Sequence, residues 1–105
     1  KRNQAFVSCL SKYLKDDAIR KSIIKINPYT VSFASSPKNT NYGTHSALHV
    51  TLSLLDLSED ERESWECVLY ECDDLSENEV ESTSFDDGQI AVKYFVKQIT
   101  NLCKN

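Results

Sequence analysis

The clearest pattern in the chain is an alternation of apolar and polar residues in "SALHVTLSLLDL", residues 46–57. Such an alternation places the apolar side chains on one face of a β-strand and the polar ones on the other. The apolar set is Leu48, Val50, Leu52 and Leu54, and the polar set is His49, Thr51 and Ser53. "YTVSFAS" (29–35) alternates as well, with Tyr29, Val31 and Phe33 on one side, and "SPKNTNYGT" between the two stretches is a loop by composition. Together the two alternating stretches predict an antiparallel β-hairpin with one face exposed to solvent.

A three-to-four-residue spacing of apolar positions at both ends of the chain predicts helices. "NQAFVSCLSKYLK" places Phe6, Leu10, Tyr13 and Leu14 on one face, with Cys9 beside them. "QIAVKYFVKQITNLCK" does the same with Ala91, Phe95, Ile99 and Leu102, and Asp86 or Asp87 is its N-cap.

"DDAIRKSIIKI" (16–26) is expected to continue or restart the first helix. Asp16 is its predicted N-cap, and Ile19, Ile23 and Ile26 share a face. Asn27-Pro28 ends this helix, because the residue before a proline is pushed out of the helical region.

The stretch "SEDERESWECVLYECDDLSENEVE" (58–81) fits two interpretations. As a helix it has a capping box at Ser58 and Glu61 and an apolar stripe of Trp65, Val68, Leu69 and Cys72. As a strand it turns Trp65, Cys67 and Leu69 towards the core, and its Trp, Cys, Val, Leu and Tyr content suits a sheet. We favour a strand from about Ser64 to Cys72 after a short helical turn. "LSENEVESTSFDDG" (75–88) is a loop or a weak edge strand.

These elements predict one α+β domain over residues 1–105, with an N-terminal helical segment, a central antiparallel sheet and a C-terminal helix. No apolar run approaches the roughly 20 residues of a membrane-spanning helix, so no membrane contact is expected.

The charged residues are distributed unevenly along the chain, and this distribution bears on the choice of partner. The net charge is −4, yet fourteen of the sixteen acids and one base, Arg62, lie between Asp56 and Asp87. The rest of the chain is basic. Such segregation steers association towards basic partners and excludes nucleic acid as a ligand of the acidic segment.

Catalytic and metal-binding patterns are weak. The chain has no G-x-S-x-G sequence, no P-loop and only two glycines, Gly43 and Gly88, so we expect no enzyme and no cofactor. A small hydrolase using Cys67 or Cys72 with His49 is a distant alternative. No metal site is expected, since Cys67-x4-Cys72 is a poor zinc spacing and His45 and His49 lie ~13 Å apart on a strand.

We expect reduced thiols at all four cysteines. The alternative is a disulfide between Cys9 and Cys103, which is possible if the two terminal helices pack together.

"LSEDERESWECVLYECDD" (57–74), together with the small size and the pI of about 5.1, resembles small acidic bacterial toxin-immunity proteins. The resemblance implies an inhibitor that binds and neutralises a basic toxin, such as a nuclease delivered by contact-dependent inhibition or a type VI system. The predicted partner-binding residues are Asp56, Glu59, Asp60, Glu61, Glu63, Trp65, Glu66, Tyr70, Glu71, Asp73 and Asp74. On the strand interpretation Trp65 faces the core, and Tyr70 is the better apolar anchor.

Two alternatives stay open. One is a non-inhibitory adaptor subunit for a basic partner. The other is a periplasmic immunity protein against a type VI amidase effector, which "FVSCLSKYL" and "ITNLCKN" resemble. Reduced thiols and a nuclease target favour a cytoplasmic protein, whereas removal of a signal peptide before Lys1 favours the periplasm.

Overall fold

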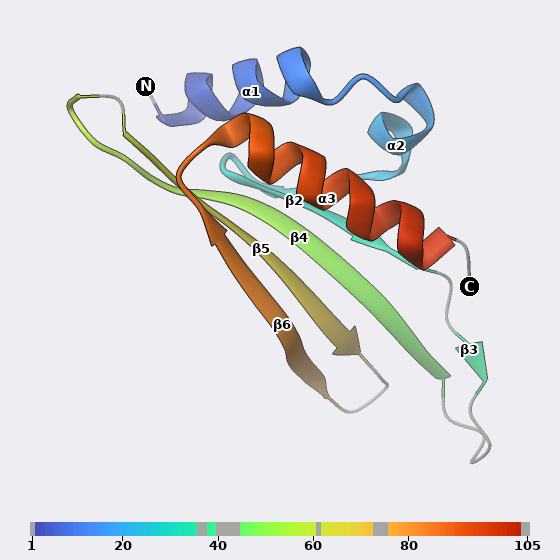
Figure 1. The fold of residues 1–105 in the computed structure, drawn as a ribbon. Coiled ribbons are helices and arrows are strands. Elements are labelled where there is room, and N and C mark those ends of the chain that lie inside the picture. Colours follow the sequence, from blue (N-terminus) through green and yellow to red (C-terminus); the bar gives the residue numbers. More distant parts are fainter. Residues whose placement is uncertain (1, 36–37, 40–44, 61, 73–75, 104–105) are drawn as a thin grey trace.

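The computed structural model describes residues 2–35, 38–39, 45–60, 62–72 and 76–103. The helices are α1 (Arg2–Tyr13), α2 (Asp17–Ser22) and α3 (Gly88–Cys103). The strands are β1 (Ile24–Asn27), β2 (Thr30–Ala34), β3 (Lys38–Asn39), β4 (His45–Leu57), β5 (Glu63–Cys72) and β6 (Glu77–Phe85). Five strands form an antiparallel sheet in the order β1-β2-β4-β5-β6, and the short β3 pairs with β4. Helices α1 and α3 cover the same face of this sheet (Figure 1), which confirms the predicted α+β architecture.

The alternation in β4 decides which face of the sheet the helices cover. Val50, Leu52 and Leu54 are completely buried beneath the helices. Their cross-strand partners on β5 are Leu69, Cys67 and Trp65, respectively. The ambiguous stretch is therefore a strand, with Trp65, Cys67 and Leu69 facing the core as the strand interpretation requires.

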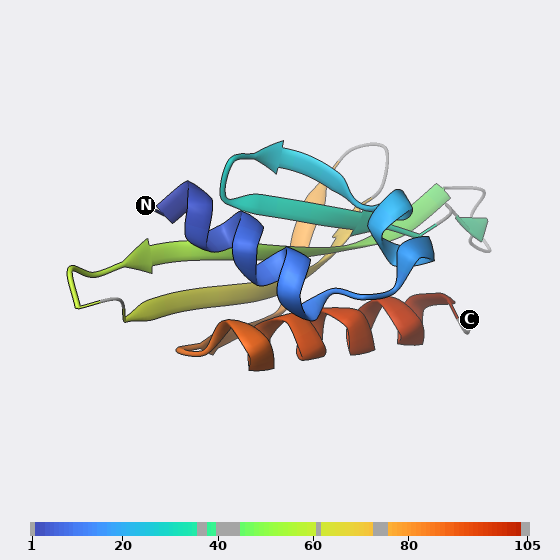
Figure 2. The same cartoon turned by 90° about the horizontal axis from the view of Figure 1, so that it is seen from above.

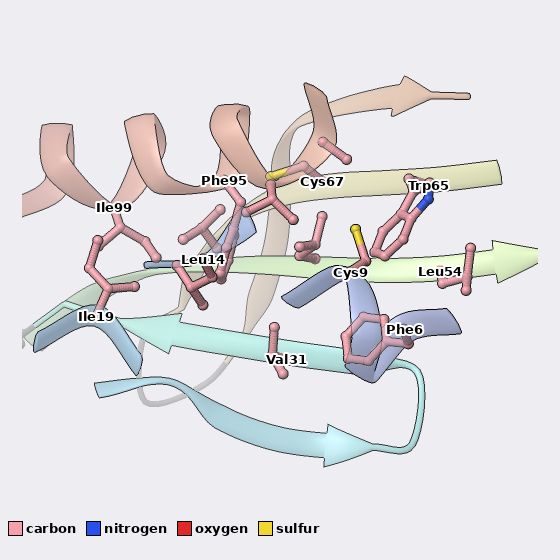
Figure 3. Close-up of a cluster of buried hydrophobic side chains, with 14 residues drawn as sticks. Phe6, Cys9, Leu14, Ile19, Val31, Leu54, Trp65, Cys67, Phe95 and Ile99 are labelled. Carbon is pink, nitrogen blue, oxygen red and sulfur yellow. The ribbon is translucent and has the colours of Figure 1, made fainter. Parts of the chain in front are cut away.

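The helices complete the core with the residues that their spacing predicts. Phe6, Cys9 and Leu14 from the N-terminal segment and Ala91, Val92, Phe95 and Ile99 from α3 are buried against the sheet. The Phe6 and Trp65 rings stack with their centroids 5.6 Å apart, and Cys9 lies beside them (Figure 3). This contact joins α1 to β5, two elements far apart in the sequence.

Side-chain caps fix where the helices begin and end. Asp16 accepts a hydrogen bond from the Ile19 amide at 3.1 Å and caps α2, as predicted. Asp87 accepts one from the Gln89 amide at 2.8 Å and caps α3. Arg20 donates through Nε to the Leu14 carbonyl at 2.6 Å, which satisfies a carbonyl just after the end of α1.

Two sequence predictions are wrong. The helix predicted to reach Asn27 ends at Ser22, and residues 24–27 form β1 instead. The spacing of the isoleucines suits a helix, but β-branched residues also suit a strand, and pairing with β2 satisfies their backbone. The short helical turn before β5 is a hairpin loop, in which the Ser58 amide donates to the Arg62 carbonyl at 3.0 Å.

Residues 75–88 were predicted to be a loop or a weak edge strand, and the strand alternative is present as β6, nine residues long. It forms the edge of the sheet opposite β1. Both edges therefore consist of strands whose residues are mostly exposed.

Replacing Gly88 with Ala should destabilise the fold, although Ala ordinarily favours a helix over Gly. A Cβ at this position would collide with the Cys9 sulfur and lie 2.9 Å from Glu63 Oε1. We expect a loss of about 1–3 kcal/mol in the free energy of unfolding, measured by urea denaturation. Gln89→Ala, one residue along the same helix, is the control and should change stability little, because Gln89 is exposed.

A double variant tests the cause of the Gly88→Ala loss. If the collision with Cys9 is responsible, Gly88→Ala should cost less in a Cys9→Ala background than in the native chain. An equal cost in both backgrounds would show that the sulfur contact is not what requires glycine.

Candidate protein-binding surface

The predicted partner-binding residues separate into three groups in the structure. Asp56, Glu59 and Asp60 are exposed at the end of the β4–β5 hairpin. Asp60 pairs with Arg62 at 2.9 Å and accepts a hydrogen bond from the Ser58 hydroxyl. The Ser58 hydrogen bond, with a smaller contribution from Arg62, holds the pKa of Asp60 below its ordinary value. This first group, the hairpin tip, is thus partly neutralised by its own arginine.

The second group, Glu63 and Trp65, belongs to the core. Trp65 is completely buried, and its indole nitrogen donates to Glu63 Oε1 at 2.9 Å. Trp65 is therefore removed from the predicted partner-binding set, because its ring is covered by Phe6 and the start of α3. The half-buried Glu63 carboxylate lies at the N-terminus of α3, where the helix dipole stabilises a negative charge.

The third group lies on the face of the sheet that α1 and α3 leave uncovered, which we call the open face. Because side chains alternate along a strand, Glu66 and Tyr70 point away from the face occupied by Trp65 and Cys67. Glu71 belongs to none of the three groups, since it is exposed on the helix-bearing face, opposite Leu48. Glu61, Asp73 and Asp74 lie outside the described residues.

The structure adds two glutamates from β6 to this surface. Glu79 is the direct cross-strand partner of Tyr70, and Glu77 is that of Cys72, so both lie on the open face. Sequence reasoning missed them because the candidate set ended at Asp74. The glutamates Glu77 and Glu79 of "ENE" were the available signal, since alternation on a strand next to Tyr70 brings these two to one face.

We call Glu66, Tyr70, Glu77 and Glu79 the acidic patch. Burial raises the pKa of the Tyr70 hydroxyl, and the charges of Glu79, Glu77 and Glu66 raise it further. Among the described residues the only ion pair is Asp60–Arg62 at the hairpin tip, so no described base neutralises the patch. Glu79 lies directly opposite the half-buried Tyr70 and Glu77 beside it on β6, whereas Glu66 lies further along the same face of β5.

The remainder of the open face is uncharged in its centre. Val68 and Ser32 are buried there by their neighbours in the sheet, and Thr30 and Ser53 are hydrogen-bonded across the strands at 2.9 Å. His49 lies opposite Tyr70 on β4. The acidic patch thus lies beside a centre of the open face that is made largely of uncharged side chains.

The cysteines offer no activated nucleophile in the core. Burial raises the pKa of both Cys9 and Cys67 to about 12, with neighbouring carboxylates adding to the effect. Both thiols are therefore protonated at neutral pH and poorly reactive. Cys67 also faces the helices whereas His49 lies on the open face, which separates these two residues. Cys72, the other cysteine of the hydrolase alternative, lies on the open face with His49.

The alternative disulfide between Cys9 and Cys103 does not fit the fold. Cys9 and Cys103 both carry free thiols. The Cys9 sulfur packs against Gly88, the first residue of α3, whereas Cys103 is the last residue of that helix. Fifteen helical steps separate them by about 22 Å, far beyond the span of a disulfide.

Other kinds of site lack support in the part of the chain that the structure describes. That part contains no cluster of three or more His, Cys, Asp or Glu side chains that could hold a metal ion. None of its helices combines the length and the apolar character needed to cross a membrane. Comparisons with protein-family models, with curated proteins and with solved structures each found no match to this chain.

We expect the free energy of unfolding to fall as the pH rises into the alkaline range, in part because of Cys67. Because its pKa is about 12 in the folded protein and 9.0 ordinarily, the buried thiol's contribution is complete below pH 9. It is lost progressively as pH rises from 9 towards 12, since only the unfolded chain then releases the proton. Cys67→Ala should be less stable than the native protein at pH 7, and this deficit should shrink above pH 9.

Urea denaturation between pH 7 and pH 10.5 measures the deficit. Cys103→Ala is the control, because Cys103 is exposed and its replacement should leave the pH profile unchanged. A Cys67→Ala deficit that stays constant across this range contradicts the raised pKa.

Proposed function

We propose that this chain binds a basic protein partner through the acidic patch, and that it acts as an immunity-type inhibitor of a basic toxin such as a nuclease. The observation that carries the proposal is the arrangement of Glu66, Glu77 and Glu79 around the half-buried Tyr70 on a sheet face that no described helix covers.

The fold itself gives no reason for this arrangement. Glu77 and Glu79 occupy neighbouring positions on the same face of β6, and no described base forms an ion pair with them or with Glu66 to offset their negative charge. Local arrangements that cost stability without a compensating contact are typical of functional surfaces. The Lys or Arg side chains of a cationic partner neutralise these carboxylates.

Tyr70 gives the patch an apolar centre. Aromatic residues are enriched among the anchors of protein interfaces, and half-burial restricts the orientation of this ring before any partner arrives. The surrounding carboxylates then pair with Lys or Arg side chains at the rim of the contact. Trp65 contributes indirectly, because its burial holds β5 against the core.

Inhibition of a nuclease suits this chemistry. A nuclease attracts phosphates, so its cleft is basic, and an acidic surface is drawn to it by long-range attraction. The exposed Asp56 and Glu59 at the hairpin tip extend the negative surface and add to the attraction. A protein that occupies the cleft excludes the nucleic acid.

The proposal is tested by capturing basic proteins from the source cell on the immobilised chain and measuring the binding of the captured protein. Glu77→Gln combined with Glu79→Gln should slow association by about tenfold at low salt, because electrostatic steering is weakened. Added salt should slow association of the native chain more than that of the variant. Tyr70→Ala should instead raise the dissociation rate.

Asp17→Asn combined with Asp86→Asn removes the same charge from exposed positions outside the patch and serves as the control. If this control slows association as much as the patch variant does, net charge and not the patch is responsible. A partner whose catalytic activity is unaffected at saturation contradicts inhibition and leaves the adaptor alternative.

A further inference from the structure

The edge of the sheet opposite the acidic patch is formed by β1, and it is unusually open. In the described part of the chain β1 pairs with β2 alone, and all four of its residues are exposed. Neither α1 nor α3 lies over it (Figure 2). The outward backbone groups of β1 are therefore available to a further strand.

The side chains of β1 do little to protect this edge. Sheet edges usually carry charges that discourage pairing, yet Ile24 and Ile26 are 62% and 61% exposed here, with Lys25 between them. Exposed isoleucines on an open edge favour association with another chain.

A groove runs along the same edge, between α1 and β1, with a volume of ≈ 230 Å³. Its apolar walls come from Phe6, Val7, Leu10, Leu14, Ile23 and Val31. Val7 is 48% exposed even though it faces this groove. The groove therefore lies on the helix-bearing side of the β1 edge, where Lys25 of β1 lines it, whereas Ile24 points to the open face.

The volume indicates the kind of occupant. Sites for small molecules usually enclose about 300–1,000 Å³, so this groove is too small for most of them. It has room for a few apolar side chains. An extended peptide that pairs with β1 directs alternate side chains to the helix-bearing side of the sheet, and those side chains enter the groove.

The charged residues that line the groove indicate which charged side chains the occupant carries. Its two charged lining residues are Arg20 and Lys25, and no described acid lines it. Arg20 is held in place, because its guanidinium also donates to the Ser11 carbonyl at 3.0 Å. The side chains that complement Arg20 and Lys25 are carboxylates. Their negative charge is opposite in sign to the positive charge that the acidic patch attracts.

We propose that this groove and β1 together form a second docking site, which accepts an extended segment of a protein partner in which every second residue, on the face turned to the groove, is either apolar or acidic. The segment adds a strand beside β1, places its apolar side chains against Val7 and Ile23, and directs carboxylates to Arg20 and Lys25. The site is independent of the proposed function, since it lies at the other edge of the sheet and selects the opposite charge.

The test uses a fluorescein-labelled peptide in which valine and glutamate take turns at every second position, with threonine between them, titrated with the full chain and followed by fluorescence anisotropy. Saturable binding is expected. Val7→Asp and Lys25→Glu should each weaken it by at least about tenfold, because one places a charge in the groove and the other reverses the charge at its wall. The same peptide with a central proline should bind weakly, since it cannot complete the strand pairing.

Val80→Asp and Lys93→Glu are matched controls, because Val80 is an exposed apolar residue of the opposite edge strand and Lys93 is an exposed lysine of α3. Both should leave peptide affinity unchanged, and thermal denaturation confirms that each variant is folded. Absence of saturable binding, or equal losses in the controls, overturns the proposal. It is also overturned if the peptide fails to bind while Val7→Asp converts a self-associating chain to a monomer, since the occupant is then a second copy.

Discussion

The burial of Trp65 is the constraint on which the arrangement of this molecule depends. Its ring stacks on Phe6 of α1 and lies against Gly88 at the start of α3, so one side chain holds both helices on the same face of the sheet. Its indole nitrogen binds Glu63, which keeps the only polar atom of the ring satisfied in the core. Gly88 is required at this point because a larger residue would displace the Cys9 sulfur.

The same burial determines where the acidic patch forms. A one-residue shift in the register of a strand moves every side chain to the opposite face. With Trp65 fixed beneath the helices, Glu66 and Tyr70 must lie on the open face, and pairing with β6 brings Glu77 and Glu79 beside them. A residue without access to solvent thus sets the chemistry of the exposed surface.

Much of the fold follows from local sequence pattern. The alternation of β4 and the spacing of the terminal helices each appear within a few residues, and Asp16 and Asp87 mark helix starts by their own side chains. The identity of β1 could not be obtained in this way. Its isoleucines satisfy a helical spacing as well as a strand, and pairing with β2 favours the strand.

The candidate surface was harder to predict than the fold, for a related reason. The density of acids in the sequence pointed to residues 56–74, but proximity in the chain is not proximity on a sheet. Glu63 is adjacent in sequence to the hairpin tip and yet serves the core, whereas Glu79 is distant from Tyr70 along the chain and lies directly opposite it. The pairing register between β5 and β6, which cannot be derived from the local sequence, is what places Glu79 opposite Tyr70.

The one-sided layering leaves the molecule with opposite charges at its two edges. Two helices packed about 10 Å apart cover fewer strands than the five present, so the sheet extends beyond them. At the β6 edge the exposed charged residues are glutamates, and at the β1 edge the exposed residues include isoleucines beside Lys25 and Arg20. Glutamates on β6 oppose pairing with a second β6, because like charges would then face each other. The β1 edge lacks an equivalent barrier, since Lys25 is its only charged residue, and so it is the edge whose backbone is easier for another chain to approach.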